Sequence, residues 1–193
     1  MKKKWLVLLI PVLALLFLGL GAVGQYNGLV DSYAEVENAQ ANVDTQLQRR
    51  YDLIPNVVAA VKGAMEHEEE IFTAIAEARA KIGSSQQGTG EYNQAQSQLD
   101  SAVSRLLVVA ENYPQLTANQ QVSDLITELE GTENRILVAR KDYNAMATSY
   151  NKKIKRFPTS IYAGLFGYEK VELFQATNDA ATTVPSVDLS DEE

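Results

Sequence analysis

The chain has 193 residues, 46% of them hydrophobic and 22% charged, a balance typical of a protein that folds around one core of ordinary domain size. Three of the 17 basic residues lie in the first four positions, so the rest of the chain carries 25 acidic against 14 basic residues. Such an acidic surface argues against binding to nucleic acid, which needs basic side chains to neutralise phosphates. The absence of cysteine excludes disulfides, thiol nucleophiles and thiolate metal sites.

An uninterrupted apolar run follows a short basic tail at residues 1–4. Residues 5–23 contain no charged or strongly polar side chain, and at about 1.5 Å per residue a helix of this length approaches the ~30 Å hydrocarbon thickness of a bilayer. We predict a transmembrane anchor over residues 5–24; a cleaved signal peptide is the alternative. No basic residue follows the run until Arg49, so the lysine bias predicts a single-pass protein of the cell membrane whose domain is extracytoplasmic.

Four stripes of apolar side chains at alternating spacings of three and four predict four long helices. The stripes cover residues 26–54, 58–82, 92–113 and 117–157. The fourth repeats an apolar residue every seven positions, which favours coiled-coil-like packing against neighbouring helices. We therefore predict an all-α protein, with an N-terminal transmembrane helix followed by a long-helix, four-helix-bundle-like domain over residues 25–174.

The segments between and after these helices also carry signals. Residues 83–90, "GSSQQGTG", predict a loop, and Pro114 should end the third helix. Residues 160–166 could form one or two amphipathic turns, and residues 168–174 a short extended piece. Residues 175–193 contain five acids and no base, which predicts an acidic disordered tail.

The stretch "RRYDLIPNVV", residues 49–58, interrupts the helical pattern with two arginines, an aspartate and a proline. We predict a corner between the first and second helices here, because Asp52 can cap the second helix and Pro55 would then lie in its first turn. A proline kink in one continuous helix is the alternative. Arg49, Arg50, Asp52 and Pro55 are therefore candidate structural or interaction residues.

Catalytic and metal-binding signals are weak. His67 is the only histidine, and together with Glu70 it could supply two metal ligands from one helix face, whereas a site needs three or four. A solvated acidic face is the preferred interpretation. Phosphate-loop and nucleophile motifs are absent, so we predict that the protein is not an enzyme and has no cofactor or bound metal.

Charged residues in or beside the apolar stripes suggest a structural role. Glu68 and Arg79 fall in the second stripe, and Glu133 and Arg140 beside the fourth. Buried charges are costly unless paired, so we expect interhelical Glu–Arg pairs that fix helix register. A pocket around these residues is the alternative.

A basic cluster lies near the end of the fourth helix and consists of Lys152, Lys153, Lys155 and Arg156. Cations are favourable at a helix C-terminus, which carries partial negative charge. In a bundle that starts at the membrane the fourth helix returns toward it. The cluster could then meet anionic lipid headgroups, at about 1 kcal/mol per base.

Three blocks of the chain, "YNGLVDSYAEVENAQANVDTQLQRRYDLIPNVV" with the residues that follow, "NYPQLTANQQVSDLITELEGTENRILVARKDYN" and "GYEKVELF", resemble the LemA family of bacterial envelope proteins. The resemblance implies a short tail, one transmembrane helix and a four-helix domain, with no established catalytic residue or cofactor. Some members are associated with membrane remodelling or sit beside membrane proteases. Relatives often have tryptophan where this chain has "ENAQANVD", and family topology has also been drawn with the domain inside the cell.

We therefore expect a single-pass membrane-anchored helical scaffold or adaptor of the bacterial cell envelope, without catalytic activity. The alternatives are a regulator or partner of a membrane protease in envelope quality control, or a membrane-remodelling factor. Expected partners are the lipid bilayer and an unidentified membrane or envelope protein, with a homo-oligomer also considered and nucleic acid excluded.

Overall fold

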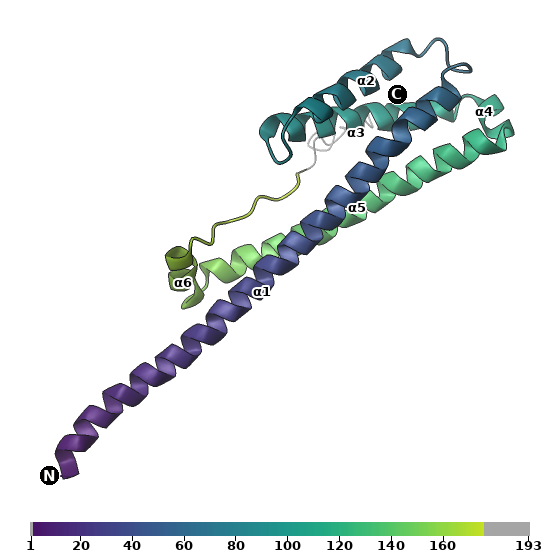
Figure 1. Ribbon diagram of the computed structural model, residues 1–193. Helices are drawn as coiled ribbons and strands as arrows, with labels where there is room; N and C mark the ends of the chain where they lie inside the picture. Colours follow the sequence, from purple (N-terminus) through teal and green to yellow (C-terminus); the bar gives the residue numbers. More distant parts are fainter. Residues whose placement is uncertain (1, 176–193) are drawn as a thin grey trace, which may run out of the picture. The chain divides into compact units, whose positions relative to one another are not determined.

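The computed structural model describes residues 2–175, and it describes side chains from residue 22 onward, except that of Thr117. Every regular element in this part of the chain is a helix, which confirms the all-α class (Figure 1). The helices are α1 (Lys2–Val61), α2 (Glu69–Ser84), α3 (Gly90–Ala110), α4 (Pro114–Ala118), α5 (Gln120–Lys155) and α6 (Thr159–Phe166).

Nearly all of the predicted anchor, residues 5–24, lies outside the described side chains, as does the predicted acidic tail beyond residue 175. Across the part of the chain that the structure describes, none of the helices has the length and apolar character needed to cross a membrane.

The described residues form two compact units. The first unit contains residues 2–48 and 133–173, and the second contains residues 49–132 and 174–175. The long helices α1 and α5 each contribute residues to both units.

The second unit has one hydrophobic core that four long helices share. Ile54 and Val61 come from α1, Ile75 from α2, Leu106 from α3 and Leu129 from α5, and all five are buried. Each belongs to one of the predicted apolar stripes, so the periodicity identified these core positions correctly. The helices α2 and α3 lie side by side (Figure 1).

The predicted corner at residues 49–58 is wrong, because α1 continues through this stretch to Val61. The helix is continuous through this stretch, as the alternative prediction required. Leu47, Ile54 and Val61 are seven residues apart and all are buried, so an uninterrupted helix keeps all three on its packed side. Asp52 accordingly lies inside a helix and does not cap one.

The end of α2 and the start of α3 lie close to the bounds of the predicted glycine-rich loop, residues 83–90. α2 ends at Ser84 and α3 begins at Gly90, where the side chain of Thr89 accepts a hydrogen bond from the amide of Tyr92 at 3.3 Å. Pro114 does not end α3, which stops at Ala110. It opens the short helix α4 instead, at the position where a missing amide donor is harmless.

The first unit pairs α1 with α5 in opposite directions. Its buried residues keep the seven-residue spacing on both helices: Leu29, Val36 and Val43 on α1, and Ile136, Tyr143 and Tyr150 on α5. The C-terminal end of α5 therefore returns to the first described side chains of α1, as expected for the fourth helix. After α6 the chain is extended.

Candidate functional site

A buried arginine lies at the centre of a polar network in the second unit. The side chain of Arg50 is 0% exposed, and its guanidinium donates to a carboxylate oxygen of Asp100 and, over 2.7 Å, to Oε1 of Gln96. Gln96 donates from Nε2 to the hydroxyl of Tyr92 at 2.9 Å. The three partners are four residues apart on α3 and so share one face. Because a buried guanidinium is costly without such partners, the network holds α1 against α3 in one register.

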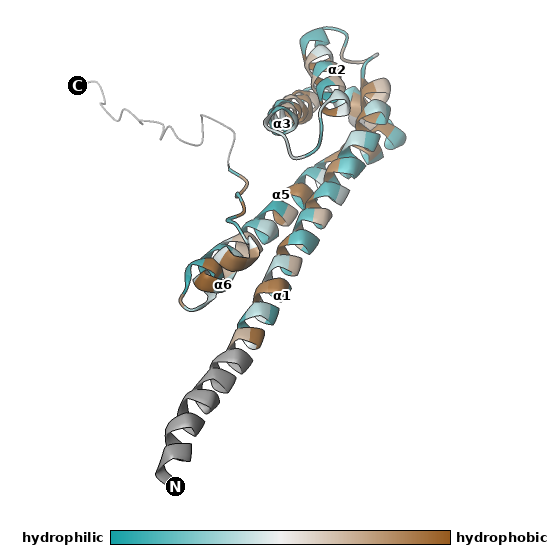
Figure 2. Ribbon diagram, turned by 60° about the vertical axis from the view of Figure 1, so that its left-hand side comes forward, coloured by the Kyte–Doolittle hydropathy of each residue, from teal (hydrophilic) through white to brown (hydrophobic). Residues whose placement is uncertain are grey.

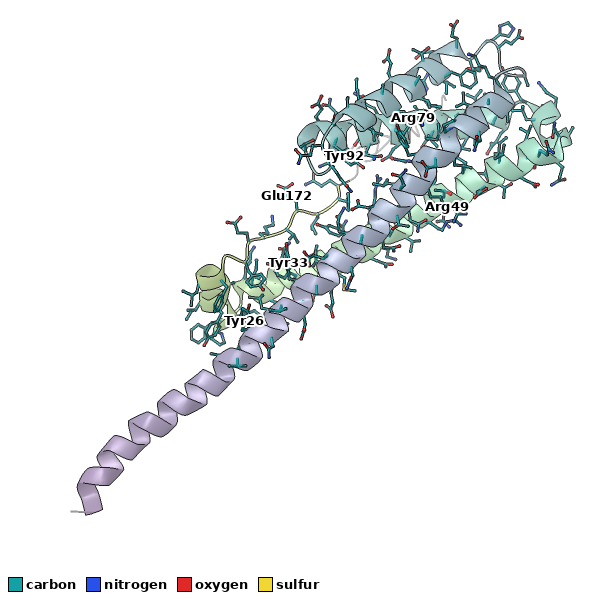
Figure 3. All side chains as sticks on the ribbon, in the orientation of Figure 1. Tyr26, Tyr33, Arg49, Arg79, Tyr92 and Glu172 are labelled. Atoms are coloured by element: carbon teal, nitrogen blue, oxygen red, sulfur yellow. The ribbon has the colours of Figure 1, made fainter. Side chains whose placement is uncertain are left out.

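The preceding arginine has a different environment. Arg49 (Figure 3) places Nη2 2.8 Å from Oε1 of Glu128 on α5, and the two side chains are 51% and 44% exposed. Successive residues point about 100° apart around a helix, so Arg49 and Arg50 contact different helices. The first makes a surface ion pair and the second a buried one.

Pro55 deprives the carbonyl of Tyr51 of its usual amide donor in the interior of α1. Arg79 of α2, labelled in Figure 3, replaces that donor: its Nη2 donates to the Tyr51 carbonyl at 3.4 Å. Its Cζ also lies 4.3 Å from the centroid of the Tyr51 ring, a cation–π contact. A neighbouring helix thus compensates for the proline, which is the physical reason why α1 can continue where a corner was predicted.

Glu68 and Arg79 each contact a tyrosine, where the sequence predicted interhelical Glu–Arg pairs. Glu68 precedes α2 rather than lying within it, and its carboxylate accepts from the hydroxyl of Tyr113 at 3.2 Å. Burial of this phenol, and next its hydrogen bond to Glu68, raises the pKa of Tyr113. Both charged residues therefore have an aromatic partner, and both contacts join separate segments of the second unit. Glu133 and Arg140 are half-buried on α5 in the first unit, where each interacts with neighbouring residues.

The acidic stretch around His67 is exposed. Among the described residues, no group of three or more histidine, aspartate or glutamate side chains is placed to hold a metal ion. A groove of about 430 Å³ lies between α2 and α3, and Glu77, Lys81 and Arg105 belong to its lining. These charged side chains are exposed, so it is a surface groove and not an enclosed reaction site.

The basic cluster at the end of α5 divides into two groups. The amine of Lys153 donates to the carbonyl of Gly28 and, at 2.6 Å, to the hydroxyl of Ser32, both on α1. The prediction that it faces lipid is therefore wrong for Lys153, which points toward α1. Gly28 leaves room for this contact, because a Cβ there would lie 3.2 Å from the lysine nitrogen. The exposed members are Lys152, Lys155 and Arg156.

The extended segment after α6, residues 168–173, is fastened to α5 by hydrogen bonds, and we call it the strap. Asn151 pairs with the main chain of Val171 in both directions: Nδ2 donates to the carbonyl at 2.8 Å, and Oδ1 accepts from the amide at 3.0 Å. The hydroxyls of Tyr150 and Tyr143 donate to strap carbonyls on either side, at 3.0 and 2.9 Å. Burial, more than neighbouring charge, raises the pKa of both tyrosines. Side chains thus replace the partner strand that an extended segment normally needs.

Aromatic rings gather where the strap, α5 and α1 meet. Tyr33 of α1 (Figure 3) has its ring centroid 5.6 Å from that of Tyr150 and 5.7 Å from that of Tyr168. Both pairs are tilted or edge-on, the arrangement that aromatic quadrupoles favour. Burial raises the pKa of Tyr168, with further contributions from Tyr26.

Sequence reasoning missed the partners in these contacts. Asp100 directly follows Leu99, a predicted core position on α3, and Gln96 lies three residues before it. An acid and an amide beside an apolar stripe were therefore the available signal. Asn151 directly follows Tyr150, a heptad position, and carried the same kind of signal. Which polar residue meets which depends on how the helices pack, and spacing along one helix does not contain that information.

Comparison with known proteins identifies a family and several related sequences. The model of the LemA family matches residues 39–189. Protein LemA of Metamycoplasma hominis is 28% identical over 86% of this chain and 76% of that protein. Magnetosome protein MamQ of Magnetospirillum gryphiswaldense is 27% identical over 88% of this chain and 71% of its own length. The family match covers well over half of the sequence, and the chain belongs to the LemA family.

Proposed function

We propose that this protein is a single-pass membrane-anchored helical scaffold or adaptor of the bacterial cell envelope. The observation that carries the proposal is that the charged side chains singled out in the sequence bind other parts of the same fold. Arg50, Arg79 and Lys153 each bind a neighbouring helix, and Glu68 binds Tyr113. Groups that could have done chemistry instead fix the positions of helices, which is the requirement of a protein that presents surfaces.

The apolar run at residues 5–23 supports the anchor, since its length matches the hydrocarbon thickness of a bilayer. Contact surfaces for a protein partner are available on α5. Leu137 and Val138 are adjacent in the first unit and are 67% and 50% exposed. The two side chains point in directions about 100° apart on α5, and large apolar side chains that are this exposed would gain by being covered in a complex.

Site-specific photocrosslinking in native membranes tests the proposal. A photoreactive residue at position 137 or 138 should capture one membrane or envelope protein, and capture from position 138 should be lost in Leu137→Glu. It should persist in His67→Ala, because the histidine has no part in a scaffold. If both positions fail to crosslink while His67→Ala reproduces the deletion phenotype, the scaffold proposal is overturned in favour of an activity at His67. Protease added to spheroplasts of the same strain tests the orientation, because an extracytoplasmic domain should be degraded.

A membrane-remodelling factor is the second candidate, and the exposed apolar side chains of α6 favour it. Vesicles reconstituted with the full chain should then change in diameter with protein density, as measured by electron microscopy. Unchanged vesicles at high protein density would leave the scaffold as the better description.

A further inference from the structure

The helix α6 turns its apolar side chains outward. Ile161 and Leu165 lie four residues apart in α6 and are 59% and 73% exposed, and Phe166 at the end of the helix is 54% exposed. Phe157, which precedes the helix, is 82% exposed. The buried residues of this helix are Thr159 and Ala163. Figure 2 shows α6 coloured as strongly hydrophobic. We call the four exposed residues the α6 surface. Four exposed large apolar side chains within ten residues are unusual on a protein surface in water and are typical of a binding surface.

The α6 surface is held at a defined place along α1. The hydroxyl of Thr159 donates to Oε1 of Gln25 at 2.8 Å, and the ring centroids of Tyr26 and Phe166 are 4.7 Å apart. Tyr26 is labelled in Figure 3. Gln25 follows the predicted anchor directly. If residues 5–24 cross the bilayer, then α6 lies at the level where the chain leaves the hydrocarbon layer.

The charge around α6 fits an anionic surface. Residues 152–167 contain four basic side chains and no acidic one, although the chain as a whole is acidic. Lys153 is engaged with α1, which leaves Lys152, Lys155 and Arg156 exposed directly before Phe157. Exposed aromatic and aliphatic side chains beside basic ones are the composition of helices that lie in the membrane interface.

We propose that the α6 surface is a second membrane contact, which inserts into the interface of an anionic phospholipid bilayer beside the anchor. The three exposed bases bind headgroups, and the four apolar side chains enter the layer beneath them. This inference rests on the proposed anchor for its position. One transmembrane helix leaves a domain free to rotate and tilt, whereas a second contact fixes how the first unit faces the membrane.

The absence of cysteine makes a site-specific test straightforward. The full chain with Leu165→Cys, labelled with an environment-sensitive fluorophore, is reconstituted into vesicles of neutral lipid or of neutral lipid mixed with phosphatidylglycerol. Leu137→Cys is the matched control, since this leucine is similarly exposed in the same unit. A label at Ile161→Cys repeats the measurement at an independent position.

The emission of the label at position 165 should shift to shorter wavelength and be quenched by quencher-bearing lipids, and both effects should be stronger in anionic vesicles. The emission of the label at position 137 should show neither effect. Replacing the three exposed bases by glutamine should remove the dependence on anionic lipid. Water-like emission at 165 and 161, in protein that floats with the vesicles after alkaline extraction, overturns the inference. A blue shift that lipid quenchers do not affect and that grows with protein density overturns the inference in favour of contact with a second copy of the chain. Loss of the protein from the vesicles signals failure of the anchor instead.

Discussion

Replacing Arg50 by methionine should destabilise the second unit far more than the same replacement of Arg49. The two residues are adjacent and chemically identical, but the Arg50 side chain is fully buried and that of Arg49 is half exposed. Methionine keeps most of the aliphatic stem, so little volume is lost. The comparison therefore isolates the effect of removing the charge.

The magnitude follows from the groups left behind. Without Arg50, the carboxylate of Asp100, which is only 20% exposed, and the buried amide oxygen of Gln96 lose a charged donor. Breaking a buried ion pair from one side costs about 3–5 kcal/mol, and the partial exposure of Asp100 places the expected loss near ~3 kcal/mol. Removing an exposed pair costs about 0–1 kcal/mol, so Arg49→Met should fall below ~1 kcal/mol.

Hydrogen exchange of the α3 amides in the reconstituted full chain measures the local free energy of opening. Protection along α3 should fall in Arg50→Met and stay near the wild-type level in Arg49→Met. The double variant Arg50→Met/Asp100→Leu should recover part of the loss, because neither charge is then left buried alone. Equal losses in the two arginine variants, or a fully additive double variant, would refute a buried, coupled ion pair.

Three further predictions concern the proline and the strap. Arg79→Met should cost about 1 kcal/mol in the wild-type background and less in Pro55→Ala, which restores the amide donor; urea unfolding of the four variants gives the coupling, and additive losses would contradict the compensation. Asn151→Ala should release the strap, so that protease Lys-C cleaves faster after Lys170, whereas unchanged cleavage would show that these hydrogen bonds do not hold it. The pKa of Tyr150 is raised by burial, so the stability that its neutral phenol contributes is complete below pH 10 and is lost as pH rises through the raised pKa. Near-ultraviolet absorbance should show this phenol ionising at higher pH than the exposed tyrosines. Ionisation at the same pH would contradict its burial.

The long helices and much of the core followed from the sequence, since the heptad positions are physical packing positions. Leu129, Ile136, Tyr143 and Tyr150 lie seven residues apart on α5, and all four are buried. An apolar residue that recurs at the helical repeat must face one side, and burial of that side is favourable whatever the partner is. The pattern therefore predicts the helix and its packed face together.

The path of α1 through residues 49–58 was not predictable in the same way. A proline inside a helix costs about 3 kcal/mol when nothing compensates, so a corner was the better local interpretation. Compensation comes from Arg79, which is distant in the sequence. A local rule fails where a residue from another helix supplies the missing hydrogen bond.

Composition predicted the basic cluster near the end of α5 but not which of its members are exposed. Four bases in five positions were compatible with the dipole of the helix C-terminus and with anionic lipid, and the structure gives the individual bases different environments. Lys153 lies on the side of α5 that faces α1, where the missing side chain of Gly28 lets the amine reach the carbonyl. The exposed bases directly precede Phe157 of the α6 surface. An amine that binds a carbonyl within the fold cannot bind a phosphate at the same time. Within this cluster, electrostatic attraction to anionic lipid must therefore come from Lys152, Lys155 and Arg156, and the apolar side chains that follow them must supply the rest of the affinity of this surface.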